Sequence, residues 1–191
     1  LALMPGCGPS PVARAANARI EVIKAPNGGI QPQAVTDARG TLHLIYFTGD
    51  PAAGDLYYLH RAPASDRFSA PIRVNSQPGS AIAVGTIRGG QIALGRKGRI
   101  HVVWNGSDRA SPRGPGGGAP LTYARLNDAG TAFEPQRNLM HATYSLDGGG
   151  TVAADGAGNV YAIWHAAPLP NAGEENRTVW VARSNDDGIT S

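Results

Sequence analysis

Short apolar segments with an alternating pattern recur three times along the chain. Those at residues 42–46, 100–104 and 160–164 each follow a glycine-containing turn and end in Tyr or Trp. Their starts are separated by 58 residues (42 to 100) and by 60 residues (100 to 160). Alternation over a few residues, after a turn that tolerates positive φ, predicts a β-strand that closes a hairpin. The recurrence predicts three structural repeats.

Each repeat contains the pattern of further strands. A first strand precedes each glycine turn, and a third strand that ends in Arg is predicted at residues 56–61, 121–125 and 179–183. A fourth strand is predicted at residues 68–74 and 133–137, where a Phe and a nearby Pro suit an outer edge strand. Four short antiparallel strands are typical of a β-propeller blade. We therefore predict an all-β chain whose domain spans residues 19–191, with blades at about 30–75, 88–139 and 148–191.

The turn after the third strand of the last repeat has a distinctive spacing of polar residues. It contains Ser184, Asp186, Gly188 and Thr190 at every second position, and a weaker copy in the second repeat keeps an Asp at 128 and a Gly at 130. An Asp carboxylate in such a turn can accept backbone N–H groups, and Gly supplies a conformation that other residues avoid. We expect a structural role for these aspartates, not a catalytic one.

With these repeats and this turn, the chain resembles the sialidase-like (BNR, Asp-box repeat) proteins that bacteria export. The resemblance covers residues from about 30 to the end. It implies a sialidase-type β-propeller with about three four-stranded blades, which is half of a six-bladed ring. Three blades alone would leave a sheet edge and half of the core open. We therefore expect downstream blades, or a second copy of the chain, to complete the ring.

Charge and cysteine usage narrow the function classes. The net charge is +3 and the pI about 9.3, but the arginines are scattered singly, so we expect no nucleic-acid partner. Cys7 is the only cysteine, which excludes an internal disulfide and a cysteine-based zinc site. We expect no metal and no cofactor.

The N-terminus has features of an export signal. The segment up to Gly6 and Cys7 resembles a lipobox, which would make Cys7 an outer-membrane lipid anchor, and a signal peptidase could instead cut after Ala15. Both alternatives predict an exported protein that is periplasmic, lipid-anchored or extracellular. Residues 1–18 are then a signal remnant, and a disordered N-terminus is the alternative.

The rim where first strands begin and second strands end carries the ligand site in propellers of this family. Arg88 and Asp147, each beside glycines that allow close approach, are the candidate catalytic residues. The candidate ligand-binding residues on the same rim are Asn105, Asp108, Tyr144 and His165. His43 and His101 occupy the same position in successive strands, which favours packing between blades over metal binding.

Three function hypotheses remain. The resemblance implies an exo-glycosidase that acts on sialic acid or related glycans, with an arginine triad, a Tyr nucleophile paired with a Glu, and an Asp acid/base. The Arg-Ile-Pro segment that carries the first arginine of that family is absent from this sequence. The alternatives are a noncatalytic glycan- or protein-binding propeller and a structural module of a larger polysaccharide-degrading protein. Fold analogy alone does not supply an activity.

Overall fold

The computed structural model describes residues 20, 22–85 and 89–190. Within these residues the fold is all-β: the elements are strands and four short 3-10 turns, with no α-helix. The strands are β1 (Ile30–Thr36), β2 (Leu42–Asp50), β3 (Ala53–Arg61), β4 (Ile72–Arg73), β5 (Gly90–Leu94), β6 (Ile100–Asn105), β7 (Leu121–Arg125), β8 (Arg137–Asn138), β9 (Tyr144–Ala154), β10 (Val160–Ala167) and β11 (Thr178–Ser184). The predicted export signal and Cys7 lie outside the described residues, so those predictions stay predictions.

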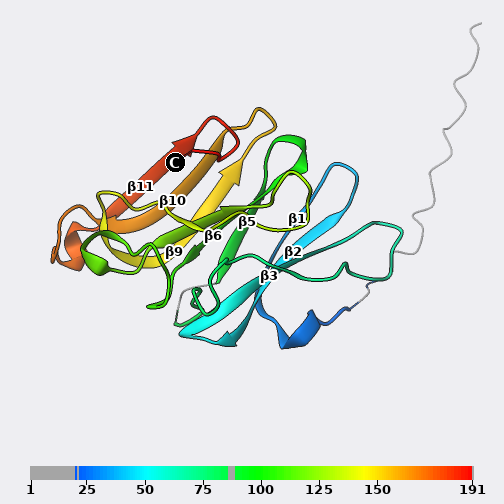
Figure 1. The fold of residues 1–191 in the computed structure, drawn as a ribbon, viewed down its shortest axis with the longest axis horizontal. Helices are drawn as coiled ribbons and strands as arrows, with labels where there is room; N and C mark the ends of the chain where they lie inside the picture. The colour runs from blue at the N-terminus through cyan, green and yellow to red at the C-terminus, as the bar shows by residue number, and fades with distance from the viewer. Residues whose placement is uncertain (1–19, 21, 86–88, 191) are drawn as a thin grey trace, which may run out of the picture.

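The strands form three antiparallel sheets, in which each strand pairs with its neighbours in the sequence. The first sheet has the order β1-β2-β3-β4, the second β5-β6-β7-β8, and the third β9-β10-β11. Figure 1 shows the sheets following one another across the molecule, from the blue and cyan strands through the green ones to the orange and red ones. The predicted all-β class and the predicted second and third strands are confirmed.

The sheets pack face to face, and each interface between them holds a hydrophobic core. Strand β5 contacts β1 and β2 of the first sheet, and β9 contacts β5 and β6 of the second. The first core contains the fully buried Phe47 and Trp104, and the second contains Leu121 and Trp164. The first strands therefore lie next to one another. We call the end where first strands begin and second strands end the rim, and the opposite end, with the β1–β2, β5–β6 and β9–β10 turns, the hairpin end.

The fourth strands are much shorter than the sequence predicted. Strands β4 and β8 have two residues each, at Ile72–Arg73 and Arg137–Asn138. Pro71 and Pro135 precede them, and because proline has no N–H group it cannot extend the ladder on that side. Phe133, just before the second of these strands, packs edge-to-face on Tyr58 of the first sheet, with ring centroids 5.9 Å apart. The aromatic residue of this turn thus holds two sheets together.

The turn at residues 184–190 closes with the predicted hydrogen bonds. The Asp186 carboxylate accepts the backbone N–H groups of Ile189 at 3.1 Å and of Thr190 at 3.1 Å. It also accepts the hydroxyl groups of Ser184 and Thr190. Those hydroxyl bonds, with the backbone bonds, hold the pKa of Asp186 well below its usual range. Asp186 is therefore occupied by the turn, in agreement with the structural role expected from the sequence.

The weaker copy of this turn closes through a different residue from the one expected. The side chain of Asn127, not of Asp128, accepts the backbone N–H groups of Thr131 at 3.0 Å and of Ala132 at 3.4 Å. Leu126 stands where Ser184 stands in the stronger copy, so there is no hydroxyl group to orient an Asp carboxylate into the turn. Asp128 instead points outward and pairs with Arg99.

A buried histidine lies at the equivalent position of the first two sheets. His43 and His101 each have Nδ1 2.8 Å from a tyrosine hydroxyl, that of Tyr58 and that of Tyr123 respectively. Nε2 of His101 lies 3.5 Å from Asp187 of the loop after β11, so this histidine packs between the second and third sheets. Burial lowers the pKa of His43, and burial lowers the pKa of His101 to about 4.

Because the pKa values of these histidines are lowered, we expect the folded chain to lose stability at mildly acidic pH. The unfolded chain takes up a proton on His101 near pH 6.5, whereas the folded chain does so only near pH 4, so protonation favours unfolding between those values. We expect the free energy of unfolding, measured with urea, to fall by about 1 to 2 kcal/mol from pH 7.5 to pH 5. His101→Gln should reduce this slope, leaving the part that His43 contributes. The exposed His141→Gln should keep the slope of the unsubstituted chain, and an equal slope in all three proteins would contradict the assignment.

Candidate functional site

The rim of the third sheet brings together two residues that the sequence singled out. Asp147 lies in β9 and His165 lies opposite it in β10, with Oδ2 of Asp147 3.7 Å from Nδ1 of His165. About half of each side chain is exposed to solvent. The alternation of β10 places Trp164 and Ala166 in the core, so His165 between them faces the other side of the sheet. An imidazole and a carboxylate are therefore presented side by side.

The start of β9 differs from the sequence-based prediction. Tyr144 and Asp147 were expected in the loop before the first strand of the third repeat, and the structure includes both in β9. The pairing of β9 with β10 is irregular here, because its register shifts on both sides of His165. Gly148 has a φ of 63°, which lets the strand bend directly after Asp147. This bend presents the Asp147 side chain at the rim.

Two charged residues that sequence reasoning missed complete the cluster. Arg177, just before β11, donates from Nη1 to Oδ2 of Asp147 at 2.9 Å, and the same nitrogen lies 3.2 Å from Oε1 of Glu174. The Arg177 side chain is only 16% exposed, so its position is well defined by packing. The sequence signal that could have found them is the acidic pair at 174 and 175, close to Arg177 in the loop between the second and third strands of the last repeat. We call Asp147, His165, Glu174 and Arg177 the rim cluster.

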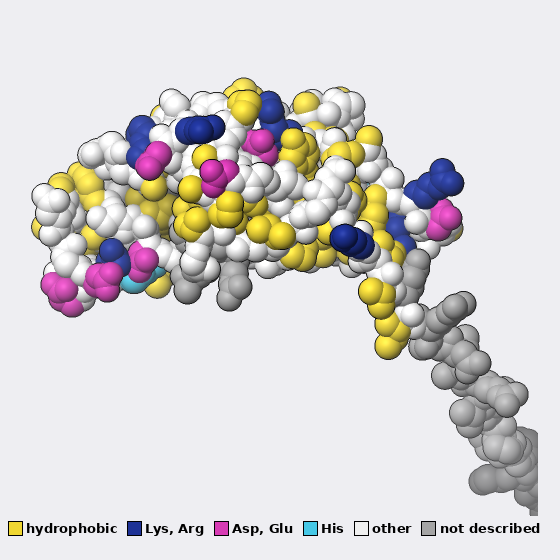
Figure 2. All heavy atoms as spheres, turned by 90° about the horizontal axis from the view of Figure 1, so that it is seen from below, with side chains coloured by type: hydrophobic (Ala, Val, Ile, Leu, Met, Phe, Trp, Pro, Cys, Tyr) yellow, Lys and Arg dark blue, Asp and Glu magenta, His cyan; other side chains and the backbone are white. Residues whose placement is uncertain are grey.

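The rim cluster has an excess of negative charge. Two carboxylates share one guanidinium group, and Glu175 beside them is exposed. Figure 2 shows acidic side chains beside basic and histidine ones at the end of the molecule where Figure 1 places the loop between β10 and β11. Because two carboxylates lie against one guanidinium group, an incoming carboxylate would meet repulsion here, whereas hydroxyl groups would find acceptors and donors.

Asn105 connects the second sheet to the rim cluster. It ends β6, is buried, and donates from Nδ2 to the backbone oxygen of Gly148 at 2.7 Å. Its carbonyl oxygen Oδ1 is also buried and has no hydrogen-bond partner among the described residues. Tyr144 lies at the beginning of β9, three residues before Asp147. Its ring lies beside Gly116 of the loop between β6 and β7. Asn105 and Tyr144 thus border the rim cluster on the side of the second sheet.

Of the other two predicted site residues, one lies apart from the cluster and one is not among the described residues. Asp108 is fully exposed and pairs with Arg113 of its own loop at 3.3 Å, so it shares no contact with Asp147 or His165. Arg88 lies outside the described residues, and its role stays a prediction. The four predicted residues that contribute to or border the site are therefore Asp147, His165, Asn105 and Tyr144.

In the described ranges, no three His, Cys, Asp or Glu side chains are grouped so that they could hold a metal ion. No helix formed by residues 20, 22–85 and 89–190 is long and apolar enough to cross a membrane.

Comparison with known proteins gives a distant likeness in fold. No protein-family model and no curated protein sequence matches the chain. Among solved structures, the chain is similar to an α-L-arabinofuranosidase from Podospora anserina in complex with cellotriose, at 12% identity and a TM-score of 0.47 over 81% of this chain and 53% of that one. It is also similar to a thermostable family-43 glycoside hydrolase, at 13% identity and a TM-score of 0.47 over 87% of this chain and 58% of that one.

A third similar structure is a polysaccharide lyase, an ulvan lyase bound to -[GlcA(1-4)Rha3S]-, at 15% identity and a TM-score of 0.45 over 87% of this chain and 40% of that one. The chain spans little more than half the length of the first two proteins and less than half of the third. At these identities and scores, the likeness assigns the chain to no family and no activity.

Proposed function

We propose that the three sheets are consecutive blades of a sialidase-type β-propeller and that its rim binds a glycan through the rim cluster. The observation that carries the proposal is the Asp147–His165 pair, half exposed and fixed by Arg177 at the end of a rigid sheet. Rigid strands that end at one rim are well suited to hold polar side chains in a defined geometry. Further blades, or a second copy of the chain, would supply the rest of the ring and of the rim.

The charge of the rim cluster favours a neutral glycan over a sialylated one. A sialic acid carboxylate needs a guanidinium group that is free to bind it through two parallel hydrogen bonds. Arg177 already binds Asp147 and Glu174, and the cluster has a net negative charge when His165 is neutral. Neutral hydroxyl groups can instead donate to Asp147 and accept from His165. On the rim, Arg88 stays the residue predicted from the sequence to bind a carboxylate ligand.

Glycoside hydrolysis is the second candidate function. The close approach of a carboxylate and an imidazole at 3.7 Å favours it, because either group can transfer a proton to or from a bound sugar. If the chain is a hydrolase, its hydrolysis of a glycoside should depend on Asp147. If it binds a glycan without hydrolysing it, it is a noncatalytic glycan-binding propeller.

The proposal is tested by glycan binding and by matched substitutions on one rim. A glycan array of neutral, sialylated and uronic acid-containing oligosaccharides should reveal binding to neutral members. The best neutral oligosaccharide, titrated by calorimetry, should bind Asp147→Asn about tenfold more weakly, because one charge-assisted hydrogen bond is lost. Asp108→Asn, on the same rim but outside the cluster, should bind as tightly as the unsubstituted chain.

Other outcomes decide between the candidate functions. Turnover of a fluorogenic neutral glycoside that Asp147→Asn abolishes would establish the hydrolase. Turnover or binding restricted to sialosides would refute the preference for neutral glycans and point to Arg88. If Asp147→Asn and Asp108→Asn both bind the neutral oligosaccharide as tightly as the unsubstituted chain, the rim cluster is not the binding site.

A further inference from the structure

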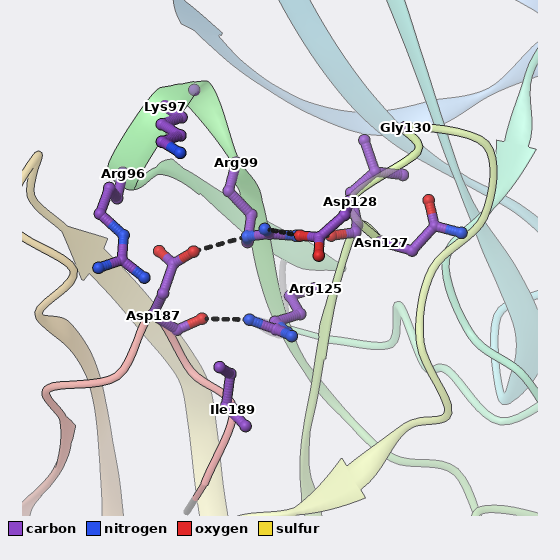
Figure 3. Close-up of a pocket in the computed structure, with 11 residues that line it drawn as sticks. Arg96, Lys97, Arg99, Arg125, Asn127, Asp128, Gly130, Asp187 and Ile189 are labelled. Atoms are coloured by element: carbon purple, nitrogen blue, oxygen red, sulfur yellow. Dashed lines mark hydrogen bonds and ion pairs between the residues drawn. The ribbon is translucent and has the colours of Figure 1, made fainter.

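A second, chemically different concavity lies at the hairpin end, between the second and third sheets. It has a volume of about 690 Å³, which is in the range of small-molecule sites. The β5–β6 turn, the turn after β7 and the loop after β11 form its walls, as Figure 3 shows. The charged residues that line it are Arg96, Lys97, Arg99, Arg125, Asp128 and Asp187. We call it the basic cavity.

The back of the basic cavity is a fixed set of paired charges. Arg99 donates from Nε to the carboxylate of Asp187 at 2.6 Å and from Nη1 to the backbone oxygen of Leu126 at 2.6 Å. Arg125 donates from Nη1 to the backbone oxygen of Asp187 at 3.0 Å. The Asp187 side chain is 3% exposed, so it serves to hold Arg99 and is not accessible to a ligand. Two guanidinium groups are thereby held rigidly at the cavity wall.

The mouth of the basic cavity holds two cations that, unlike Arg99 and Arg125, are exposed. Arg96 and Lys97 lie at the tip of the β5–β6 turn and are exposed. Neither side chain makes a hydrogen bond or ion pair with another described residue. Backbone hydrogen bonds close the turn itself. The Gly95 N–H donates to the backbone oxygen of Arg99 at 2.8 Å, and the Gly98 N–H donates to the backbone oxygen of Gly95 at 3.1 Å. Both cations are therefore available to an incoming ligand.

Asp128 is the replaceable partner in this arrangement. It pairs with Nη2 of Arg99, but its side chain is 88% exposed, and an ion pair so open to water contributes little to stability. The lining has four cations against two carboxylates, of which Asp187 is inaccessible, and Arg125 also pairs with Glu134 outside the lining. An oxyanion that replaced Asp128 on Arg99 would also meet Arg96 and Lys97. It would gain charge-assisted hydrogen bonds from groups already held in place.

We propose that the basic cavity is a binding site for a small molecule that carries an oxyanion, either a carboxylate or a phosphate. The rim cluster has the opposite charge and lies at the other end of the sheets, so this site is separate from the proposed glycan site and does not depend on it. Arg99 would hold the anionic group, Arg96 and Lys97 would approach it from the mouth, and Asp128 would compete with it. Arg125, which is buried and paired with Glu134, would support the cavity wall.

The test is a calorimetric or NMR titration at low ionic strength with three probes: inorganic phosphate, glucuronate and neutral glucose. We expect binding of phosphate or glucuronate and none of glucose, and the two anions distinguish a phosphate site from a carboxylate site. The double variant Arg96→Ala/Lys97→Ala should weaken anion binding about tenfold, because two charge-assisted contacts are lost. Asp128→Asn should strengthen it severalfold, because the competing carboxylate is gone.

The first sheet offers a matched control for nonspecific charge effects. Arg39 lies in the equivalent β1–β2 turn and is exposed, but it pairs with Asp37 and lines no part of the basic cavity. Arg39→Ala should leave the affinity unchanged. The proposal is overturned if neither anion binds, if glucose binds as well as glucuronate, or if Arg39→Ala weakens binding as much as the double variant does.

Discussion

Replacing Gly188 with Ala is expected to destabilise the folded chain by about 3 kcal/mol or more. Gly188 has a φ of 72°, which costs a residue with a Cβ atom energy before any contact is considered. A Cβ at this position would overlap the hydroxyl oxygen of Tyr123 and lie 2.9 Å from Cζ. The Tyr123 ring cannot easily move away, because it is buried and its hydroxyl group bonds His101 at 2.8 Å.

Gly130 provides the matched control for this substitution. It holds the equivalent place in the weaker copy of the turn, with a φ of 68°, but nothing lies within 4 Å of where its Cβ would be. Gly130→Ala should therefore cost only the backbone term, about 1 to 2 kcal/mol. Urea denaturation monitored by tryptophan fluorescence measures both. Equal costs for the two glycines would show that the turn does not press on Tyr123.

The second large effect is expected for Asp187→Asn. The Asp187 carboxylate is buried between the second and third sheets, where it accepts from Arg99 and lies 3.5 Å from His101. Asn fits the space and tolerates the φ of 63° at this position, but it removes the negative charge that compensates Arg99. Loss of one partner of a buried ion pair should cost about 3 kcal/mol in the free energy of unfolding.

Asp128→Asn is the control: it removes an ion pair with Arg99 without leaving a buried charge unpaired. Asp128 pairs with the same guanidinium but is exposed, so its replacement should change the free energy of unfolding by less than about 1 kcal/mol. Both variants can be compared by urea denaturation at pH 7. If Asp128→Asn costs as much as Asp187→Asn, the contact between the two sheets does not depend on the buried carboxylate.

The strands were predictable because their pattern is local. The alternation in residues 42–46, 100–104 and 160–164 reports burial on the faces of a sheet, and the glycine turns report the hairpins, so each repeat could be recognised from its own residues. The predicted length of the fourth strands was too great, also for a local reason. Phe68 and Phe133 suggested sheet positions, but each precedes a proline that limits the ladder, and Phe133 packs on the neighbouring sheet instead.

The contacts between sheets were not predictable, because they join residues far apart in the sequence. Asp187 directly follows Asp186, the aspartate of the turn motif. The motif itself gives no sign that Asp187 is buried and paired. Its partner Arg99 lies 88 residues earlier. At the rim, the glycines after Asp147 indicated a candidate site, and β10 placed His165 beside it. Arg177 was missed because only the packed loop before β11 brings it to Asp147 at 2.9 Å.

The most direct test of the central claim is an NMR titration of the chain with the neutral oligosaccharide that binds best on the glycan array. Backbone amide shifts report where the ligand lies. If a glycan binds through the rim cluster, the largest shifts will fall in residues 144–150, 163–167 and 174–178, and residues 96–99 and 126–130 at the hairpin end will stay unchanged. Shifts confined to the hairpin end, or no shifts at all with any neutral oligosaccharide, would contradict the account.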